Sequence, residues 1–325
     1  IFVMTARGNT RRLKKERIST CLKGEFNMPI HPIEYRYGTP EMKSIWTEEE
    51  KLKKLLEVEA ALARSEADVG IVPEEAAEVI SKRIEDVNLE RVKEIEREIG
   101  HDIMAVVIAL SEKCGEYGGW VHLGATSNDI SDTALALHLR DATSIIEKRL
   151  GKLMEVLIDL SEKHKKTVCV GRTHGQIAIP TTYGMRFALW ACEIERHMKR
   201  LEEVKSRILV GKMSGAVGTG AAFGEKGIEI EKKCMEYLGL KRAEITNQIV
   251  QRDRHAEFLF LLANIATTLD KICTEIRTLS RTEIRELEER FGERQVGSST
   301  MPHKRNPVRS EQVCGLARII RSLVG

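Results

Sequence analysis

One stretch of the sequence, GSSTMPHKRNP at residues 297–307, combines side chains that could do acid–base chemistry on an anion. Ser298 and Ser299 precede Lys304 and Asn306, and a proline lies on either side of the basic run. A loop of this composition can close over an anion, with the lysine and the asparagine donating to it. By residue type alone, a surface loop bounded by glycine and proline is an equal alternative.

Two further polar clusters precede long segments with helical periodicity. Residues 121–134, VHLGATSNDISDTA, contain four consecutive small polar residues that begin with Thr126 and Ser127. One of the four is enough to cap a helix, and a helix N-terminus with extra hydroxyls can bind a carboxylate or phosphate. Residues 169–184 place His174 among Arg, Thr and Gln side chains. A lone loop histidine is usually a surface residue, but this setting makes His174 a candidate for proton transfer near neutral pH.

A fourth cluster, TNQIVQRDRHAEF at residues 246–258, brings Gln248, Arg252 and Arg254 to a predicted helix start. Basic residues at this end of a helix oppose its macrodipole. We therefore expect an anion, or carboxylates of another subunit, to compensate the two arginines. The alternative is a solvated helix start.

The elements that carry these clusters are predicted to be helices. Thr47 and Glu50 form a capping-box sequence before an apolar stripe that ends near Gly70. The same signals predict short helices at about 74–84, 89–98 and 102–115, long ones at about 129–165, 182–210 and 252–290, and another from 307. Helices near 30 residues exceed the usual length of about 11–12 and predict a long bundle. Its apolar faces predict oligomerisation.

Several motifs of cofactor chemistry are absent from the sequence. The glycine-rich stretch 216–224, AVGTGAAFG, lacks GK[ST] and the strand context of a nucleotide-binding loop, so it is predicted to be a tight loop or small hairpin. The nine histidines form no HExxH or HxH, and no Cys/His set has zinc spacing. We therefore predict neither a metal nor a cofactor.

The composition excludes several classes of protein. The chain has 325 residues, is 42% hydrophobic and 31% charged, and is typical of a helix-rich globular protein. Residues 1–27 hold seven Lys or Arg and two Glu, so the other 298 residues carry a net charge of −2 and predict no nucleic-acid partner. The longest apolar run, residues 103–110, is far below the roughly 20 residues of a membrane span. Seven scattered cysteines predict reduced, mostly buried thiols and a cytoplasmic location.

The first 27 residues differ in pattern from the rest. They have neither a packed-helix pattern nor the apolar core of a signal peptide. We expect Met28 to be the native start and residues 1–27 to be a non-native or disordered leader. A basic arm that binds nucleic acid is the alternative.

Five stretches together resemble the fumarase/aspartase superfamily of lyases. GSSTMPHKRNP is similar to its signature loop over eleven residues, and four others stand in the expected order: EYRYGTPEMKSIW, HLGATSNDISDTA, GRTHGQIAIPTTYG and NQIVQRDRHAEF. The resemblance runs from about Met28 to the end of the chain. Within the superfamily it is to the branch that releases fumarate from succinylated purine nucleotides.

This resemblance implies roles for individual residues. Ser298 matches the general base, His174 the general acid, and His101 a second active-site histidine. Lys304 and Asn306 match contacts to a substrate carboxylate, and Thr126 and Ser127 match contacts to the succinyl end. Arg36 and Tyr37 match residues near the nucleotide phosphate. His122 and Gln248 also match substrate contacts. The substrates implied are small molecules.

The resemblance also implies an all-α fold in a homotetramer whose active sites are each shared by three subunits. We expect a small N-terminal helical domain at residues 28–119. A long central bundle is expected at residues 120–325, incomplete at its C-terminal end. The C-terminal domain of the superfamily is missing from this chain.

Three different functions compete with this one at the level of sequence. A carboxymuconate cycloisomerase can carry a very similar signature loop, and an argininosuccinate lyase carries a related one. The Arg36-Tyr37 pair and the QRDRH stretch favour the purine branch. A third possibility is a structural protein that keeps the bundle without the chemistry, although Ser298, His174 and Lys304 are all present.

Overall fold

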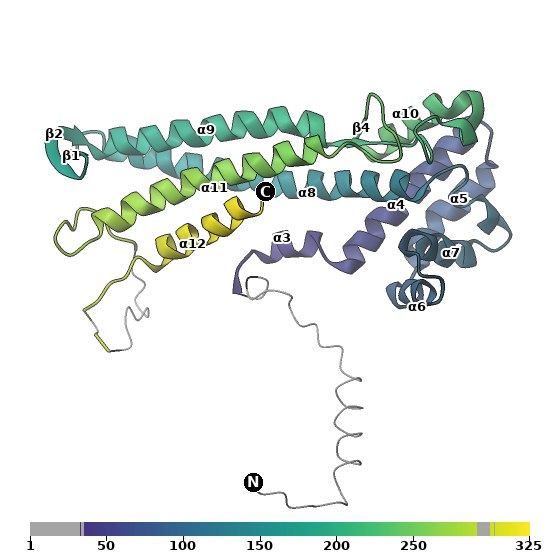
Figure 1. Ribbon diagram of the computed structural model, residues 1–325, viewed down its shortest axis with the longest axis horizontal. Coiled ribbons are helices and arrows are strands. Elements are labelled where there is room, and N and C mark those ends of the chain that lie inside the picture. The colour runs from purple at the N-terminus through teal and green to yellow at the C-terminus, as the bar shows by residue number, and fades with distance from the viewer. Residues whose placement is uncertain (1–32, 34–35, 291–299, 302) are drawn as a thin grey trace, which may run out of the picture. The chain divides into compact units, whose positions relative to one another are not determined.

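Figure 1 shows a computed structural model of the chain, which describes residues 33, 36–290, 300–301 and 303–325. The chain divides into two compact units, residues 1–43 and 44–325. In the first unit, the Thr39 hydroxyl accepts a hydrogen bond from the Met42 amide (3.3 Å) where helix α3 (Pro40–Ile45) begins. Arg36 and Tyr37 lie just before this helix in the chain.

The second unit contains four helices of 10 to 21 residues before the bundle, and several of their ends follow local capping signals. Thr47 caps the first of them, its hydroxyl accepting from the Glu50 amide at 3.2 Å, as the sequence predicts. Asn88 caps the third by accepting from the Glu90 amide (2.7 Å), and Gly100 ends it in the left-handed conformation. These helices are α4 (Glu48–Asp68), α5 (Glu74–Arg83), α6 (Leu89–Ile99) and α7 (Asp102–Cys114).

The predicted long helices form a bundle in which α9 packs on α8 and α11, and α12 packs on α11 (Figure 1). Their bounds are α8 (Ser127–Lys163), α9 (Tyr183–Ile208), α11 (Asp253–Leu279) and α12 (Val308–Ser322). The prediction that the third long helix reaches residue 290 is wrong, because it ends at Leu279. There the chain turns back, and the Leu279 carbonyl accepts from the Glu286 amide at 2.9 Å. This turn lets the Glu286 side chain bind Arg172 and Tyr183, a tertiary contact that no helical periodicity encodes.

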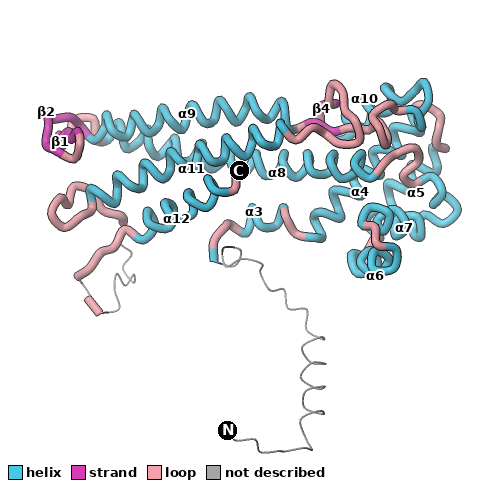
Figure 2. Tube along the Cα trace, viewed as in Figure 1, coloured by secondary structure: helices cyan, strands magenta, loops and turns pink. Residues whose placement is uncertain are grey.

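Strands are few among the described residues, and helices dominate the trace (Figure 2). The antiparallel hairpin β1 (Val168–Thr173) and β2 (Gln176–Thr182) joins α8 to α9. Helical periodicity indicated only a break here. The two-residue strands β3 (Val210–Gly211) and β4 (Lys241–Arg242) pair in parallel. Residues 216–220 of the glycine-rich stretch form the predicted loop, whereas residues 221–224 belong to a 3₁₀ helix, Ala221–Lys226.

Two hydrophobic cores meet along α8. The first contains residues of α4 to α7, the first turns of α8 up to Leu137, and α10 (Gly227–Leu238). The second begins at Leu139 and contains the rest of α8 with α9 and α11. One helix thus belongs to both cores and holds the two ends of this unit at a fixed separation.

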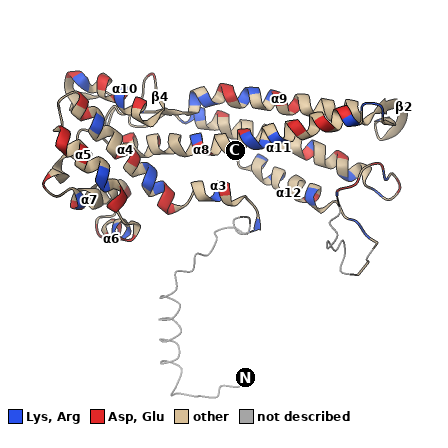
Figure 3. Ribbon diagram, turned by 180° about the vertical axis from the view of Figure 1, so that it is seen from behind, with Lys and Arg blue, Asp and Glu red and all other residues tan. Residues whose placement is uncertain are grey.

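Lys and Arg residues are interspersed with Asp and Glu residues along α9 and α11 (Figure 3). Several pair between helices, such as Lys205 with Glu147 (2.7 Å) and Arg207 with Glu257 (2.5 Å). Exposed pairs of this kind each stabilise a protein by at most about 1 kcal/mol. No helix of the described residues is long and apolar enough to cross a membrane.

The cysteines follow the prediction within the described part of the chain. Six are free thiols, and four of these are buried: Cys114, Cys169, Cys234 and Cys314. Cys21 lies outside the described residues.

Candidate active site

The start of α8 is held in place by a buried carboxylate. Asp129 accepts hydrogen bonds from the amides of Thr126 (2.9 Å), Ser214 (3.0 Å) and Gly215 (3.0 Å). It also pairs with the Lys212 ammonium, and both side chains are fully buried. A charge buried in this way is tolerated only because it is paired and hydrogen-bonded. The network fixes where Thr126 and Ser127, the cap and the first residue of α8, lie.

His122 lies in the turn just before this helix start, with a left-handed backbone (φ 66°). Its Nδ1 is 2.7 Å from Oε1 of Glu59, a fully buried residue of α4. Burial disfavours the imidazolium, but the hydrogen bond and charge of Glu59, together with the charge of Asp129, outweigh it and raise the pKa of His122. A non-glycine residue in this conformation is uncommon and marks a position that the surrounding structure constrains.

The segment with Gln248 runs along the first turns of α8. The Ser214 and Thr246 hydroxyls are 2.9 Å apart, and the Val250 amide donates to Asp132 of α8 at 2.8 Å. Gln248 lies between these two anchors with its side chain exposed. His122, Thr126, Ser127 and Gln248 are therefore gathered at one end of the unit.

The two arginines at the start of α11 are compensated within the chain itself. Arg252 pairs with Asp132 (2.7 Å), and Arg254 pairs with Glu244 (2.6 Å). The expectation of an external anion or of another subunit's carboxylates at these residues is therefore wrong. Sequence spacing could not reveal Asp132 as the partner, since it lies 120 residues away.

His174 occupies the tip of the β1–β2 hairpin at the opposite end of α8. The two turn residues, His174 (φ 54°) and Gly175 (φ 76°), both have positive φ, as a tight two-residue hairpin turn requires. The His174 side chain is exposed. Glu286 anchors the hairpin by binding Arg172 and the hydroxyl of Tyr183 (3.0 Å), and the hydrogen bond from Arg172 lowers the pKa of Glu286 although partial burial opposes this.

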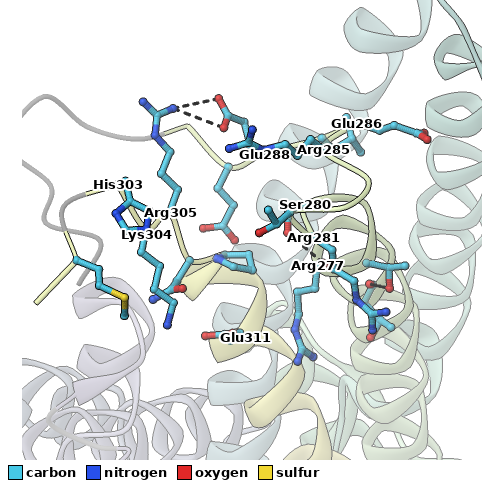
Figure 4. Close-up of a pocket in the computed structure, with 18 residues that line it drawn as sticks. Arg277, Ser280, Arg281, Arg285, Glu286, Glu288, His303, Lys304, Arg305 and Glu311 are labelled. Atoms are coloured by element: carbon cyan, nitrogen blue, oxygen red, sulfur yellow. Dashed lines mark hydrogen bonds and ion pairs between the residues drawn. The ribbon is translucent and has the colours of Figure 1, made fainter. Parts of the chain in front are cut away.

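A pocket of about 1200 Å³ lies beside the signature loop, between the end of α11 and the start of α12. Lys304 and Asn306 line it, with Glu311 of α12. Figure 4 shows further cations around it, and Arg305 is paired with Glu288 at 3.3 Å. The additional arginines of the lining are Arg277, Arg281 and Arg285. Four glutamates also line the pocket, Glu286, Glu288, Glu289 and Glu311, so its five Lys and Arg side chains leave it a net charge of +1.

The amides at the start of α12 are already occupied. Glu289 accepts from the amides of Arg309 (3.1 Å) and Ser310 (2.7 Å) and from the Ser310 hydroxyl (2.6 Å). An anion in the pocket is therefore left with side-chain cations rather than with these amides. The residues 291–299, which include the predicted base Ser298, lie outside the described residues.

The predicted site residues are thus divided among three places in one chain. His122, Thr126, Ser127 and Gln248 lie at the N-terminal end of α8, whereas His174 follows its C-terminal end. At 1.5 Å per residue, the 37 residues of α8 separate these ends by about 55 Å. Lys304 and Asn306 line the pocket beside α11 and α12, whose lining does not include His174. One copy of the described chain does not assemble a complete site.

Three other predicted residues, His101, Arg36 and Tyr37, are not part of these sets. His101 caps α7, its Nδ1 accepting from the Met104 amide at 3.3 Å, and half of its side chain is exposed. Arg36 belongs to the first unit with Tyr37. Their assignment to substrate stays a prediction.

The sequence patterns did not point to several residues that build these places. Glu59, Lys212, Glu286 and Glu289 each bind a predicted site residue or its immediate support. The sequence does contain a signal for Glu59, which follows Leu52 by seven residues on the apolar stripe of α4. A charged residue at such a core position is unusual and indicates a specific buried partner. The other three had none, since their partners are distant in sequence.

No group of three or more His, Cys, Asp or Glu that could hold a metal ion occurs within the described part of the chain. The chemistry available to these residues is proton transfer by histidine and stabilisation of anions by Lys304, the arginines and the helix N-terminus of α8.

Comparison with known proteins gives a consistent result. A family described as lyase matches residues 34–321. The chain is 64% identical over 299 residues to the adenylosuccinate lyase of Pyrococcus abyssi, a match that covers 91% of this chain and 66% of the relative. It is 45% identical over 287 residues to the adenylosuccinate lyase of Bacillus subtilis, covering 88% of this chain and 65% of that protein. The chain thus spans about two thirds of the length of the curated relatives it matches.

Solved structures share the fold. The 3-carboxy-cis,cis-muconate lactonizing enzyme of Pseudomonas putida is 37% identical with a TM-score of 0.82, covering 90% of this chain and 66% of that one. A fumarate lyase from Mesorhizobium sp. BNC1 is 34% identical with a TM-score of 0.79, covering 87% and 64%. The all-α bundle predicted from the sequence is confirmed. The family match covers most of the chain, and the chain belongs to this lyase family, within the fumarase/aspartase superfamily that its motifs resemble.

Proposed function

We propose that the chain provides the catalytic residues of an adenylosuccinate lyase. The reaction is a β-elimination: a base removes a proton from the succinyl carbon next to a carboxylate, the C–N bond breaks, and the leaving nitrogen is protonated. The products from adenylosuccinate are fumarate and AMP. The same chemistry on SAICAR, the succinylated aminoimidazole carboxamide ribotide, gives fumarate and AICAR. The identity of 64% to an archaeal adenylosuccinate lyase supports this choice of substrate.

The proton transfers fall to Ser298 and His174. Ser298 is the general base and His174 the general acid that protonates the leaving nitrogen, with His101 as a second histidine of the site. A serine hydroxyl is a weak base, so it needs a water-free, positively charged setting at the moment of reaction. The five Lys and Arg side chains that line the pocket beside the signature loop exceed its four glutamates by one charge, which supports such a setting near Lys304.

The anionic intermediate is stabilised by cations and hydrogen-bond donors. Removal of the carbon-bound proton adds negative charge to the neighbouring carboxylate, and donors aimed at it lower the barrier. Lys304 and Asn306 take this role, while Thr126 and Ser127 bind the succinyl end at the N-terminus of α8. Arg36 and Tyr37 bind near the nucleotide phosphate, and His122 and Gln248 are further substrate contacts.

The separation of these residues along α8 is the observation that supports an active site shared between subunits. Because about 55 Å of helix separates the residues at the start of α8 from His174 in one copy, a complete site requires residues from different copies. We propose a homotetramer with active sites shared between subunits. Exposed apolar side chains on the bundle, such as Leu189 and Phe260, support such contacts. The protein is further proposed to be cytoplasmic and to need no cofactor, nucleic acid or membrane.

The test is direct measurement of turnover. The purified chain is assayed by ultraviolet absorbance with adenylosuccinate and SAICAR. We expect His174→Ala and Ser298→Ala each to lower kcat by about 10²–10⁴, the usual contribution of a positioned acid or base. Near-normal turnover in either variant would refute the role assigned to that residue.

A second candidate function is the cycloisomerase reaction of muconate enzymes. The 37% identity to the Pseudomonas putida lactonizing enzyme favours it over an argininosuccinate lyase reaction or a purely structural role. The same absorbance assay with carboxymuconate, and with argininosuccinate as a further comparison, separates the candidates. Turnover of carboxymuconate without turnover of adenylosuccinate would replace the proposed function.

A further inference from the structure

Two carboxyl groups lie on the buried face of α4 without the partners that buried acids normally have. Glu59 and Glu66 are seven residues apart, so they occupy the same stripe of the helix, and both are almost completely buried. The Glu59 Oε1 atom is 2.7 Å from His122, whereas its Oε2 atom has no hydrogen-bond partner. Neither oxygen of Glu66 has one. Natural proteins rarely leave such groups unpaired, so each calls for an explanation.

The contact between Glu59 and His122 is an ion pair rather than a contact of neutral groups. A buried carboxylate is costly unless an opposite charge accompanies it, and the imidazole is the one hydrogen-bonding partner that Glu59 has among the described residues. Because Nδ1 faces the carboxylate, it donates its proton there. The other ring nitrogen, Nε2, then carries the remaining proton of the imidazolium. The His122 side chain keeps 12% exposure, so the ring is accessible from one side.

We propose that Glu59 is a positioning residue: it holds His122 as an imidazolium so that Nε2–H can bind an anionic group of the substrate. The anion is a carboxylate or a phosphate, the two anionic groups that the substrate of the proposed function carries, and in that respect the inference rests on the proposed function. Glu59 itself does not touch the substrate. It acts through the charge and orientation of His122.

Glu66 differs from Glu59 because no cation faces it. A fully buried carboxyl without a partner keeps its proton, and burial, together with the charge of Glu59, raises the pKa of Glu66 to about 8. At neutral pH Glu66 is therefore uncharged and adds no second negative charge beside the contact between Glu59 and His122. The other titratable groups around this place are Asp129 with its partner Lys212, Glu231 with its partner Arg242, and the buried thiol of Cys234.

The decisive experiment compares the same substitution at the two acids. The full chain is labelled at histidine, and the His122 NMR signal is assigned by its loss in His122→Gln. We expect the apparent pKa of His122 to lie above the ordinary histidine value of about 6.5 in the wild type and in Glu66→Gln. In Glu59→Gln the apparent pKa of His122 falls below that value, because burial lowers the pKa and the Glu59 carboxylate no longer raises it. An unchanged His122 titration in Glu59→Gln overturns the proposal.

Ligand binding is the second measurement. Inorganic phosphate and fumarate are added separately, so that the anion which perturbs the His122 signal identifies the group bound. We expect one of them to perturb it in the wild type and in Glu66→Gln, and to bind Glu59→Gln roughly ten- to a hundredfold more weakly, as expected for a lost charged hydrogen bond. If neither anion perturbs His122 in the wild type, the inference is wrong.

Two controls keep the result interpretable. If Glu59→Gln does not fold, the ring ¹⁵N shifts of wild-type His122 at pH 7 decide: two protonated nitrogens support the proposal, and a neutral ring overturns it. Absence of adenylosuccinate turnover in the wild type would count against the proposed function. It would not change what the His122 titration says about Glu59.

Discussion

Individual carboxyl groups in this chain differ in charge and structural role, according to their neighbours. Asp129 accepts from three amides and an ammonium and fastens two segments together, whereas Glu66 has no hydrogen-bond partner and stays protonated. Residue type and spacing predict which residues belong near the chemistry, such as Thr126 at a helix start. They do not predict which acid is ionised, because that depends on partners brought together by the fold.

The stability of the chain should depend on pH through Glu66. In the folded chain Glu66 releases its proton at about pH 8, whereas in the unfolded chain it does so near 4.5. Between these values the unfolded state binds fewer protons, so the free energy of unfolding falls as pH rises. Glu66→Gln removes this dependence. We expect the difference in urea midpoint between Glu66→Gln and the wild type to grow in favour of the variant from pH 5 to pH 8. Parallel midpoints for the two proteins across that range would contradict a protonated Glu66.

At the scale of elements, local signals predict the helices well and the connections poorly. The cap at Thr47 and the stop at Gly100 act within a few residues, so periodicity and capping locate these helix ends. The end of α11 and the hairpin that carries His174 depend on Glu286 binding Arg172, a contact across 114 residues. Long-range contacts of this kind have no signature in a single sequence.

The junction of α8 and α9 predicts contrasting effects for two glycines. A Cβ at Gly184 would lie 2.5 Å from the Lys165 Cα and 2.6 Å from the Ser161 carbonyl oxygen, whereas at Gly151, in the middle of α8, the nearest atom is 3.9 Å away. We expect Gly184→Ala to destabilise the chain by about 1–3 kcal/mol, because backbone must move. Gly151→Ala should be neutral or up to about 1 kcal/mol more stable, through helix propensity.

Thermal unfolding of both variants checks this pair. The matched substitution separates the close approach at the junction from a general effect of replacing glycine in a helix. A melting temperature for Gly184→Ala equal to that of Gly151→Ala would show that the two helices can move apart without cost.

At the scale of the whole molecule, the sequence predicted the family and the dispersed motifs, but not which of them meet. One copy places His174 and Ser127 at opposite ends of a 37-residue helix. Motif order along a chain does not say whether two motifs join within one copy or between copies. The length of α8 shows that these two motifs do not meet within one copy, because a rigid helix cannot bring its own ends together.

Shared sites predict that two inactive variants restore each other. We expect His174→Ala and Ser127→Ala to be nearly inactive alone, and a mixture dissociated and reassembled to recover part of the wild-type kcat, because some sites then receive both intact residues. Turnover of adenylosuccinate and the size of the assembly by light scattering are measured together. A mixture that assembles but stays as inactive as its components would place the site within one copy.

Because α8 belongs to both hydrophobic cores, its length is constrained against insertions and deletions. Inserting one residue in its middle would turn one end by about 100° relative to the other and lengthen the helix by about 1.5 Å. The middle of α8 lies within the second core, which contains Leu139, Leu150 and Leu157, so the insertion would turn the apolar side chains on one side of it away from that core. Length changes inherited in this lineage should therefore collect in the connections between helices, while α8 varies by substitution alone.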